Sequence, residues 1–173
     1  MHRSLALALA LALAPAKRLS PTGAAVLLVL GLGALAVRDA EANPLAGKVI
    51  VSDAEFGTGY GSDADMMKAV KKQAKTTIKG DGASWTLNLM VFLKEAPGAT
   101  TINIVYYDVS VKPRDQVNFS EVKVQTTQKI VQVNGVAISK DLGFVKGHKY
   151  EVLATRVIGG KEKVYAKGTV TLK

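Results

Sequence analysis

Residues that could perform acid–base chemistry are few in this sequence, and they are not grouped. His148 is the only histidine after residue 42, and it lies in the predicted turn Lys146–Lys149. A general base needs a held geometry and a partner, and the nearest carboxylate along the chain, Asp141, has no nucleophile near it. We therefore predict a solvent-exposed turn histidine and no catalytic residue.

Four carboxylates around residue 60 could supply the hard oxygen ligands that calcium prefers. They are Asp53, Glu55, Asp63 and Asp65. A glycine loop divides them with a spacing that is wrong for an EF-hand, and helix capping explains the last two. That loop, Gly57–Gly61, stands between a predicted strand and a predicted helix, as phosphate-binding loops do. Its spacing fits neither common nucleotide fingerprint, so we predict no metal and no cofactor.

Lysine has the strongest pattern of any charged residue type here. One cluster falls within twelve residues, and a second lies on the last predicted hairpin. The candidate anion-binding residues are Lys68, Lys71, Lys72, Lys75, Lys79, Lys161, Lys163 and Lys167. Such clusters bind anionic lipids or polymers, or they form a hydrated surface that also guards edge strands. Interleaved aromatic and arginine residues are missing, so we predict no dedicated nucleic-acid motif.

Composition excludes several classes of protein. The chain has 173 residues, with 23 Lys and Arg against 14 Asp and Glu, which gives a net charge of +9. It has no cysteine, which excludes a disulfide framework, a thiolate metal site, a thiol nucleophile and a lipidated cysteine. The length favours one domain with at most an appendage.

The start of the chain resembles a targeting segment. A basic pair, Lys17-Arg18, precedes an apolar run over 24–37, and Ala40-Glu41-Ala42 provides a small-x-small cleavage site. Cleavage before Asn43 would leave a mature chain of 131 residues with a net charge of +7. We therefore predict a signal peptide over residues 1–42 and an exported protein, either periplasmic or extracellular.

Two alternatives concern this segment. An earlier Ala/Leu run over 4–16 indicates either a long bipartite signal or an over-extended gene start. An uncleaved membrane anchor over 19–37 is the second alternative. Its truly apolar part is shorter than the roughly 20 residues that a spanning helix needs.

After residue 43 the pattern of apolar residues predicts one helix followed mainly by strands. Ser62 precedes acidic residues and an apolar spacing at Met66 and Val70, which predicts a helix over 63–74. Trp85, Leu87, Leu89, Val91 and Leu93 alternate with polar and apolar residues, as in a strand. The strands are predicted over 48–52, 75–79, 85–93, 100–111, 117–126, 129–139, 149–158 and 162–172.

Turn signals divide these strands. Gly80-Asp81-Gly82 predicts a hairpin between two of them. Asn134-Gly135 is either a hairpin turn or a bulge within one long strand. In the last strand the alternation places Val164 and Ala166 on one face and Tyr165 on the other.

Short strands at regular intervals predict a mainly β domain, either an antiparallel β-sandwich or a small barrel, after a short N-terminal helix. The expected organisation is an export signal over 1–42, an extension with the helix over 43–71, and the sandwich domain over 72–173.

The stretch Phe144-x-x-Gly147-x-x-Tyr150-x-Val152-x-Ala154 resembles the tyrosine corner of fibronectin type III and related immunoglobulin-like domains. The resemblance favours the sandwich over the barrel: it implies an immunoglobulin-like antiparallel β-sandwich in which the Tyr150 hydroxyl bonds back to the upstream backbone. Trp85 lies on an early strand, where this family often has a tryptophan. The resemblance covers about residues 72–173 and implies no function, because such sandwiches host many unrelated ones.

Three hypotheses for function follow. The first is an exported, non-enzymatic binding or structural module of the cell envelope or extracellular space, with Tyr107, Phe119 and Tyr165 as candidate contact residues if they are exposed. The second is an electrostatic binder of an anionic envelope polymer or lipid. The third and least favoured is an enzyme of unknown type. The sequence does not identify the partner; another envelope protein and an anionic polymer are the two candidates.

Overall fold

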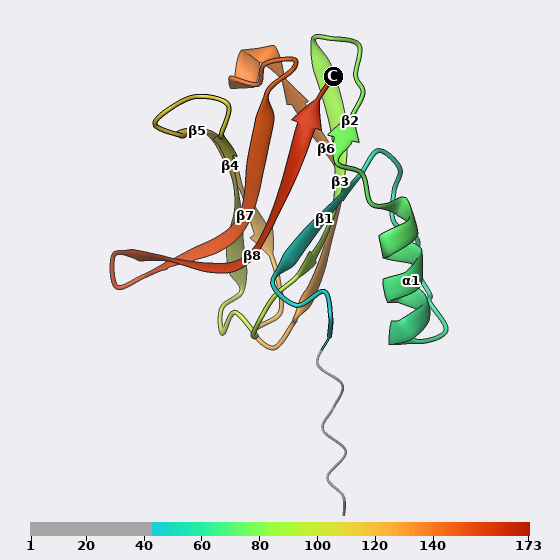
Figure 1. Ribbon diagram of the computed structural model, residues 1–173. Coiled ribbons are helices and arrows are strands. Elements are labelled where there is room, and N and C mark those ends of the chain that lie inside the picture. Colours follow the sequence, from blue (N-terminus) through green and yellow to red (C-terminus); the bar gives the residue numbers. More distant parts are fainter. Residues whose placement is uncertain (1–42) are drawn as a thin grey trace, which may run out of the picture. The chain divides into compact units, whose positions relative to one another are not determined.

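Eight strands and one α-helix account for most of the regular structure in residues 43–173, the part of the chain that the computed structural model describes (Figure 1). The strands are β1 (Lys48–Ser52), β2 (Thr77–Ile78), β3 (Ser84–Phe92), β4 (Thr101–Asp108), β5 (Asp115–Lys123), β6 (Ile130–Ser139), β7 (Lys149–Ile158) and β8 (Lys161–Leu172). The helices are α1 (Asp63–Gln73) and the short 3₁₀ helix η1 (Lys140–Leu142). The prediction of a mainly β chain with one helix near residue 63 is confirmed. The export signal predicted over residues 1–42 lies outside the described residues.

All eight strands belong to one nearly closed sheet. Seven of them follow the order β5-β4-β7-β8-β1-β3-β6, and β2 pairs with β8. The link between β8 and β1 is a single parallel bridge, Lys48 with Lys167, whereas the other neighbours in this order are antiparallel along their length. The sheet therefore consists of two antiparallel groups, β5-β4-β7-β8 and β1-β3-β6, joined at one point.

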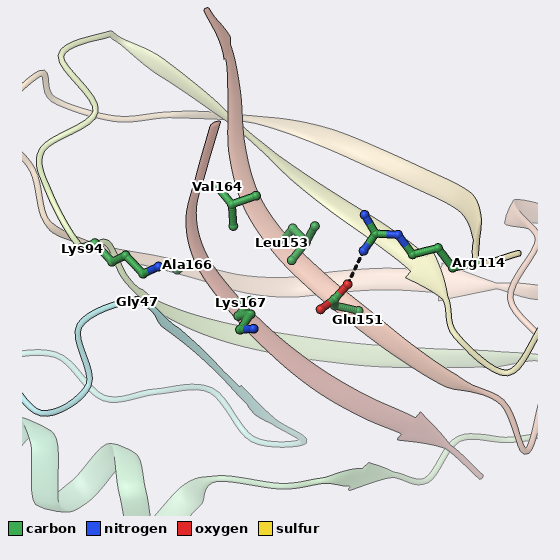
Figure 2. Close-up of a pocket in the computed structure, with 8 residues that line it drawn as sticks. All are labelled: Gly47, Lys94, Arg114, Glu151, Leu153, Val164, Ala166 and Lys167. Atoms are coloured by element: carbon green, nitrogen blue, oxygen red, sulfur yellow. Dashed lines mark hydrogen bonds and ion pairs between the residues drawn. The ribbon is translucent and has the colours of Figure 1, made fainter. Parts of the chain in front are cut away.

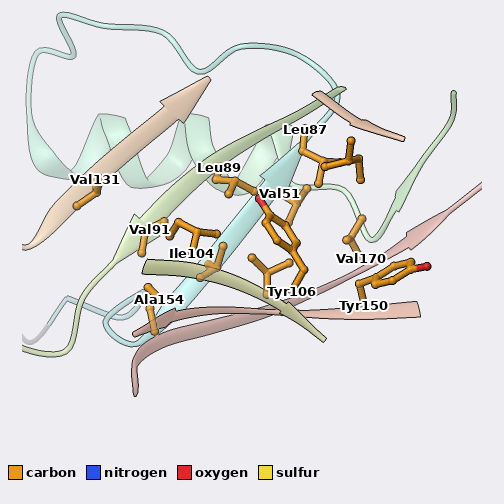
Figure 3. Packing of buried hydrophobic residues seen from close by; sticks show 14 of the residues in the cluster. Val51, Leu87, Leu89, Val91, Ile104, Tyr106, Val131, Tyr150, Ala154 and Val170 are labelled. Carbon is orange, nitrogen blue, oxygen red and sulfur yellow. The ribbon is translucent and has the colours of Figure 1, made fainter. Parts of the chain in front are cut away.

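The main hydrophobic core contains residues from both groups of strands (Figure 3). The predicted face of β3 supplies Trp85, Leu87, Leu89 and Val91 to it, and Leu93 follows directly after the strand. Strands of the other group contribute Ile104, Tyr106, Val152 and Ala154, among others. Alternation along each strand sends every second side chain to this core, so the period-two pattern predicted it correctly.

Helix α1 packs beside β1 and covers a second, smaller core. Ser62 accepts the Asp65 backbone N–H at 3.1 Å and so caps the helix as predicted. Val70 is fully buried and packs with Met90 and Phe92, the β3 side chains that point away from the main core. One face of β3 is covered by the main core and the other by α1, which explains why both faces are apolar.

The segment before residue 72, expected as an extension, packs against the strands that follow it. β1 pairs with β3 over its whole length, and Val49 and Val51 belong to the main core. The described residues, 43–173, belong to one compact unit.

The prediction of a hairpin at Gly80-Asp81-Gly82 is wrong. β2 pairs with β8 in parallel rather than with β3, so the turn joins two strands that are not hydrogen-bonded neighbours. The Asp81 carboxylate accepts the backbone N–H groups of Ala83 and Ser84 at 2.8 and 2.6 Å. These bonds hold the pKa of Asp81 below its usual range. The aspartate stabilises a local turn without strand pairing.

Two of the register irregularities in the sheet account for departures from the predicted pattern. Gly135 lies inside β6 with φ of 65°, opposite an irregularity in the β3–β6 register, and its N–H donates to Asn88 Oδ1 at 2.9 Å. Asn134-Gly135 is thus a bulge and not a turn. A second irregularity lies in the β7–β8 register, where Ala154 pairs with Ala166 but Thr155 pairs with Val164. Tyr165 is the extra residue, and it is buried in the core instead of facing outward as predicted.

Candidate functional site

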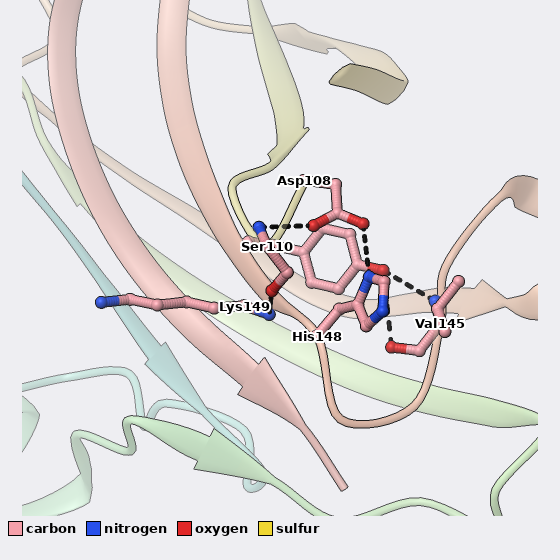
Figure 4. A network of polar contacts seen from close by, with 6 residues as sticks. Asp108, Ser110, Val145, His148 and Lys149 are labelled. Atoms are coloured by element: carbon pink, nitrogen blue, oxygen red, sulfur yellow. Dashed lines mark hydrogen bonds and ion pairs between the residues drawn. The ribbon is translucent and has the colours of Figure 1, made fainter. Parts of the chain in front are cut away.

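His148 is held by a carboxylate that the sequence analysis did not identify. Its Nδ1 lies 2.6 Å from Oδ2 of Asp108 at the end of β4 (Figure 4). The other carboxylate oxygen of Asp108 accepts the Ser110 N–H at 2.8 Å. Asp108 lies opposite Tyr150 in the β4–β7 register, so strand pairing brings this carboxylate to the turn before β7. Asp141, the carboxylate nearest in sequence, is exposed and is not the partner.

The same turn contains a hydrogen bond between the Tyr150 hydroxyl and the backbone upstream of it. The Tyr150 hydroxyl accepts the Val145 N–H at 2.7 Å, and the Phe144 ring packs on Tyr150 with centroids 5.0 Å apart. Burial raises the pKa of the Tyr150 hydroxyl, the Val145 bond opposes that rise, and the nearby Asp108 carboxylate adds to it. Tyr150 is therefore a neutral structural group at ordinary pH.

These contacts connect strand ends that lie far apart in the sequence. The hydroxyl of Ser110, the nearest alcohol in the network, accepts the Lys149 N–H at 2.8 Å and so is occupied by the backbone. His148 lines none of the three surface hollows described below. The Asp108–His148 pair joins the end of β4 to the turn that precedes β7.

The first lysine cluster lies on and just after α1. Lys68, Lys71 and Lys72 are exposed on the helix, and none of them forms an ion pair with another residue of the described range. Lys75 lies 4.0 Å from Asp53. Lys79 is exposed directly after β2.

The second lysine cluster lies on β8, far from the helix. Lys161 is exposed where β8 begins, and Lys163 bonds to Glu95 at 2.8 Å, which raises the pKa of this lysine. Lys167 is exposed further along the strand. In Figure 1 the β7–β8 hairpin and α1 lie on opposite sides of the sheet. The eight predicted lysines therefore do not form one patch.

The outer face of the group β5-β4-β7-β8, meaning the face turned away from the core, presents a mixed apolar and cationic surface. Phe119, Val105, Leu153 and Lys167 are direct partners across the four strands, so their side chains form one row on this face. Phe119 is 58% exposed, and Val157, near the end of β7, is 60% exposed. No helix of the described chain covers this row, since α1 packs beside β1 and β3.

Charged side chains on this face surround a hollow of about 290 Å³, which we call the Arg114 hollow (Figure 2). Its lining includes Lys94, Arg114, Glu151, Leu153, Val164 and Lys167. The Arg114 guanidinium pairs with Glu151 at 2.5 Å and lies over the Tyr107 ring at 4.2 Å. Leu153 and Val164 lie between this pair and the two lysines.

A second hollow of about 210 Å³, the Phe119 hollow, lies along the same face and is lined by Val105, Phe119, Thr155 and Val157. Of the three aromatic residues proposed as contacts, Phe119 is exposed, Tyr107 is half-buried under Arg114, and Tyr165 is buried. A third hollow of about 370 Å³ lies between α1 and the end of β1, next to Lys72 and Lys75.

Within residues 43–173 no three His, Asp or Glu side chains are grouped closely enough to hold a metal ion. Asp53, Glu55, Asp63 and Asp65, considered from the sequence as calcium ligands, are not brought together as such a group. No helix of the same range is long and apolar enough to cross a membrane.

Comparison with protein-family models, with curated proteins and with solved structures gives no match to this chain.

Proposed function

We propose that this chain is an exported, non-enzymatic β-sandwich module that binds a partner through the outer face of β5-β4-β7-β8. The observation that carries this proposal is the exposure of Phe119 and Val157, at 58% and 60%, on a sheet face that contains two hollows. Large apolar side chains grouped on an open face mark interaction surfaces.

An immunoglobulin-like fold of the fibronectin type III kind is part of the proposal. Two antiparallel groups with the order β1-β3-β6 and β5-β4-β7-β8 correspond to the A-B-E and C′-C-F-G strands of such sandwiches. Tyr150 then lies on the strand equivalent to F and Trp85 on the strand equivalent to B. The bond from the Val145 N–H to the Tyr150 hydroxyl is the contact that the tyrosine corner requires.

The non-enzymatic part of the proposal rests on the polar network around His148. Asp108 fixes the ring, but the hydroxyl of Ser110 is bonded to a backbone amide, and Tyr150 is kept neutral by burial. A hydrolytic site needs an activated nucleophile within reach of the base. Export is proposed from the signal-like pattern over residues 1–42, and the N-terminal mass of the cellular protein tests it, with Asn43 as the expected first residue.

Photo-crosslinking in the cells that make the protein tests the binding face. A benzoylphenylalanine is placed at Phe119 or Val157, and the control position is Leu142 on η1, which is 45% exposed. We expect the two outer-face positions to give crosslinked products of the same mass and Leu142 to give none. Identical products at all three positions, or none at Phe119 and Val157, would contradict the proposal.

A second candidate function, binding of an anionic polymer or lipid through α1, is favoured by the three exposed helix lysines that form no ion pair in the described range. It predicts retention on a sulfated resin that falls steeply as salt rises. Replacing Lys68, Lys71, Lys72 and Lys75 by alanine should abolish that retention. If the quadruple variant elutes at the same salt concentration as the parent protein, this candidate fails.

A further inference from the structure

We propose that the Arg114 hollow binds a carboxylate side chain of a partner protein between Lys94 and Lys167, with an apolar side chain of the same segment on Leu153 and Val164. This inference rests on the proposed function, since it names the kind of partner that the outer face takes. The occupant is an acidic, partly apolar peptide segment.

The first argument is how Lys94 is positioned. Gly47 lies beside it with φ of 79°, and a Cβ added there would meet Cε and Cγ of Lys94 at 2.7 and 2.9 Å. The Lys94 stem therefore lies directly against the backbone at Gly47, and a Cβ there would have to displace it. The Gly47 carbonyl also accepts the Lys167 N–H at 3.0 Å. Gly47 thus stands between the two lysines and connects the backbones that carry them.

The second argument is charge. Arg114 already has a carboxylate partner in Glu151, so the charges on that side of the hollow cancel. Lys94 and Lys167 are exposed, and neither is paired with a carboxylate within residues 43–173. The hollow therefore carries a local excess of positive charge at one end. A carboxylate bound there would find two ammonium groups, while Glu151, the internal carboxylate of the same lining, is already paired with Arg114.

The third argument is the apolar floor. Leu153 is almost fully buried and Val164 is partly exposed, and both lie between the charged ends (Figure 2). A sugar polymer offers little apolar surface to such a floor. The volume, about 290 Å³, is at the lower limit of pockets that enclose a small molecule, which begin at roughly 300 Å³. The space suits one or two side chains of a larger partner.

The fourth argument is continuity with the rest of the face. Lys167 and Leu153 belong to the same cross-strand row as Val105 and Phe119. A partner that places a carboxylate at Lys167 therefore lies next to the exposed Phe119 ring. Charge complementarity at one end of the row and apolar contact at the other together favour a protein partner over a small anion.

A titration followed by NMR tests the proposal on the full chain labelled with ¹⁵N. The probe is a seven-residue, blocked peptide with one glutamate and, two residues later, one leucine, because alternate side chains of an extended segment share a face. The control peptide has glutamine for glutamate. We expect millimolar binding with shifts at the Leu153, Val164 and Lys167 amides, and about tenfold weaker binding of the glutamine peptide, since two exposed ion pairs are each worth up to about 1 kcal/mol.

Two charge-matched variants locate the effect. Lys94→Gln with Lys167→Gln should weaken the glutamate peptide about tenfold, and Lys68→Gln with Lys71→Gln on α1 should change its affinity less than about twofold. Equal losses in the two variants would overturn the proposal in favour of diffuse electrostatics. Equal affinity for both peptides, with shifts at Phe119 and Val157, would also overturn it but leave the proposed binding face standing. Absence of shifts anywhere on the outer face would count against the carboxylate site, and the crosslinking experiment would then decide the face itself.

Discussion

Two buried tyrosines should respond in opposite ways to replacement by phenylalanine. Loss of the hydroxyl should stabilise the protein at Tyr106 and destabilise it at Tyr150. Tyr106 and Tyr150 are 2% and 0% exposed, and both rings pack against Phe144. Within residues 43–173 the Tyr106 hydroxyl is buried without a hydrogen-bond partner. The Tyr150 hydroxyl instead accepts the Val145 N–H at 2.7 Å. Tyr106→Phe thus removes an unpaired polar group, whereas Tyr150→Phe removes a bond.

The magnitudes follow from these two environments. A buried hydroxyl without a partner costs about 1–3 kcal/mol, and part of the gain on its removal is offset by the small gap left behind. We expect Tyr106→Phe to raise the free energy of unfolding by about 1 kcal/mol. Tyr150→Phe should lower it by about 1–2 kcal/mol, because the net value of the bond is lost and the Val145 amide is left unpaired. The two variants should then differ by about 2–3 kcal/mol.

Urea unfolding followed by tryptophan fluorescence measures this difference. The chain has one tryptophan, Trp85, which is buried and donates its indole N–H to the Lys173 carbonyl at 3.0 Å. Its emission therefore reports loss of the core, and an unchanged slope against urea shows that the denatured states are comparable. A lower unfolding free energy for Tyr106→Phe would refute the reasoning, because it would mean that the hydroxyl makes a favourable contact.

Other substitutions and conditions give further tests. A Cβ at Gly168 would lie 2.2 Å from the Val49 carbonyl oxygen, so Gly168→Ala should lower the unfolding free energy by about 2–3 kcal/mol, while the control Gly57→Ala, where only ordinary contacts would form, should change it by less than about 0.5 kcal/mol in the same urea assay. Ser62→Ala removes the cap of α1 and should cost about 1 kcal/mol, visible as faster amide hydrogen exchange in that helix. Burial raises the pKa of Tyr106 above its ordinary value. Unfolded chains therefore ionise first as pH rises, so stability should be full below about pH 10 and decline above it, less steeply in Tyr106→Phe.

Strand periodicity predicted most of the sheet, because burial on one face imposes a two-residue repeat. The helix was equally readable, since Ser62 and the spacing of Met66 and Val70 are local signals. Strand partners were harder to predict, because nothing local in the sequence indicates that Thr77 and Ile78 pair with β8. A glycine-aspartate turn predicts a bend in the chain, but long-range packing decides which strands meet.

The same difference between local signals and long-range packing decides which candidate site residues were predicted correctly. Phe119 was named as a candidate contact residue on condition that it is exposed, and its exposed fraction is 58%. Tyr165 was assigned to the wrong face because one extra residue in β8 shifts the register, and no sequence pattern marks that bulge. The partner of His148 was missed since Asp108 is forty residues away. Alignment of the two predicted strands over 100–111 and 149–158 as neighbours would have found it.

The single bridge between β1 and β8 has a consequence for the order of events during folding. β1 is the first strand of the described chain and β8 is the last, and their contact joins the two groups of strands. A chain synthesised from its N-terminus can pair β1 with β3 and β4 with β5 early. It cannot connect the two groups until Lys167 has been made. Contacts between segments so far apart in sequence form slowly, so the last strand sets the time at which the sheet is completed.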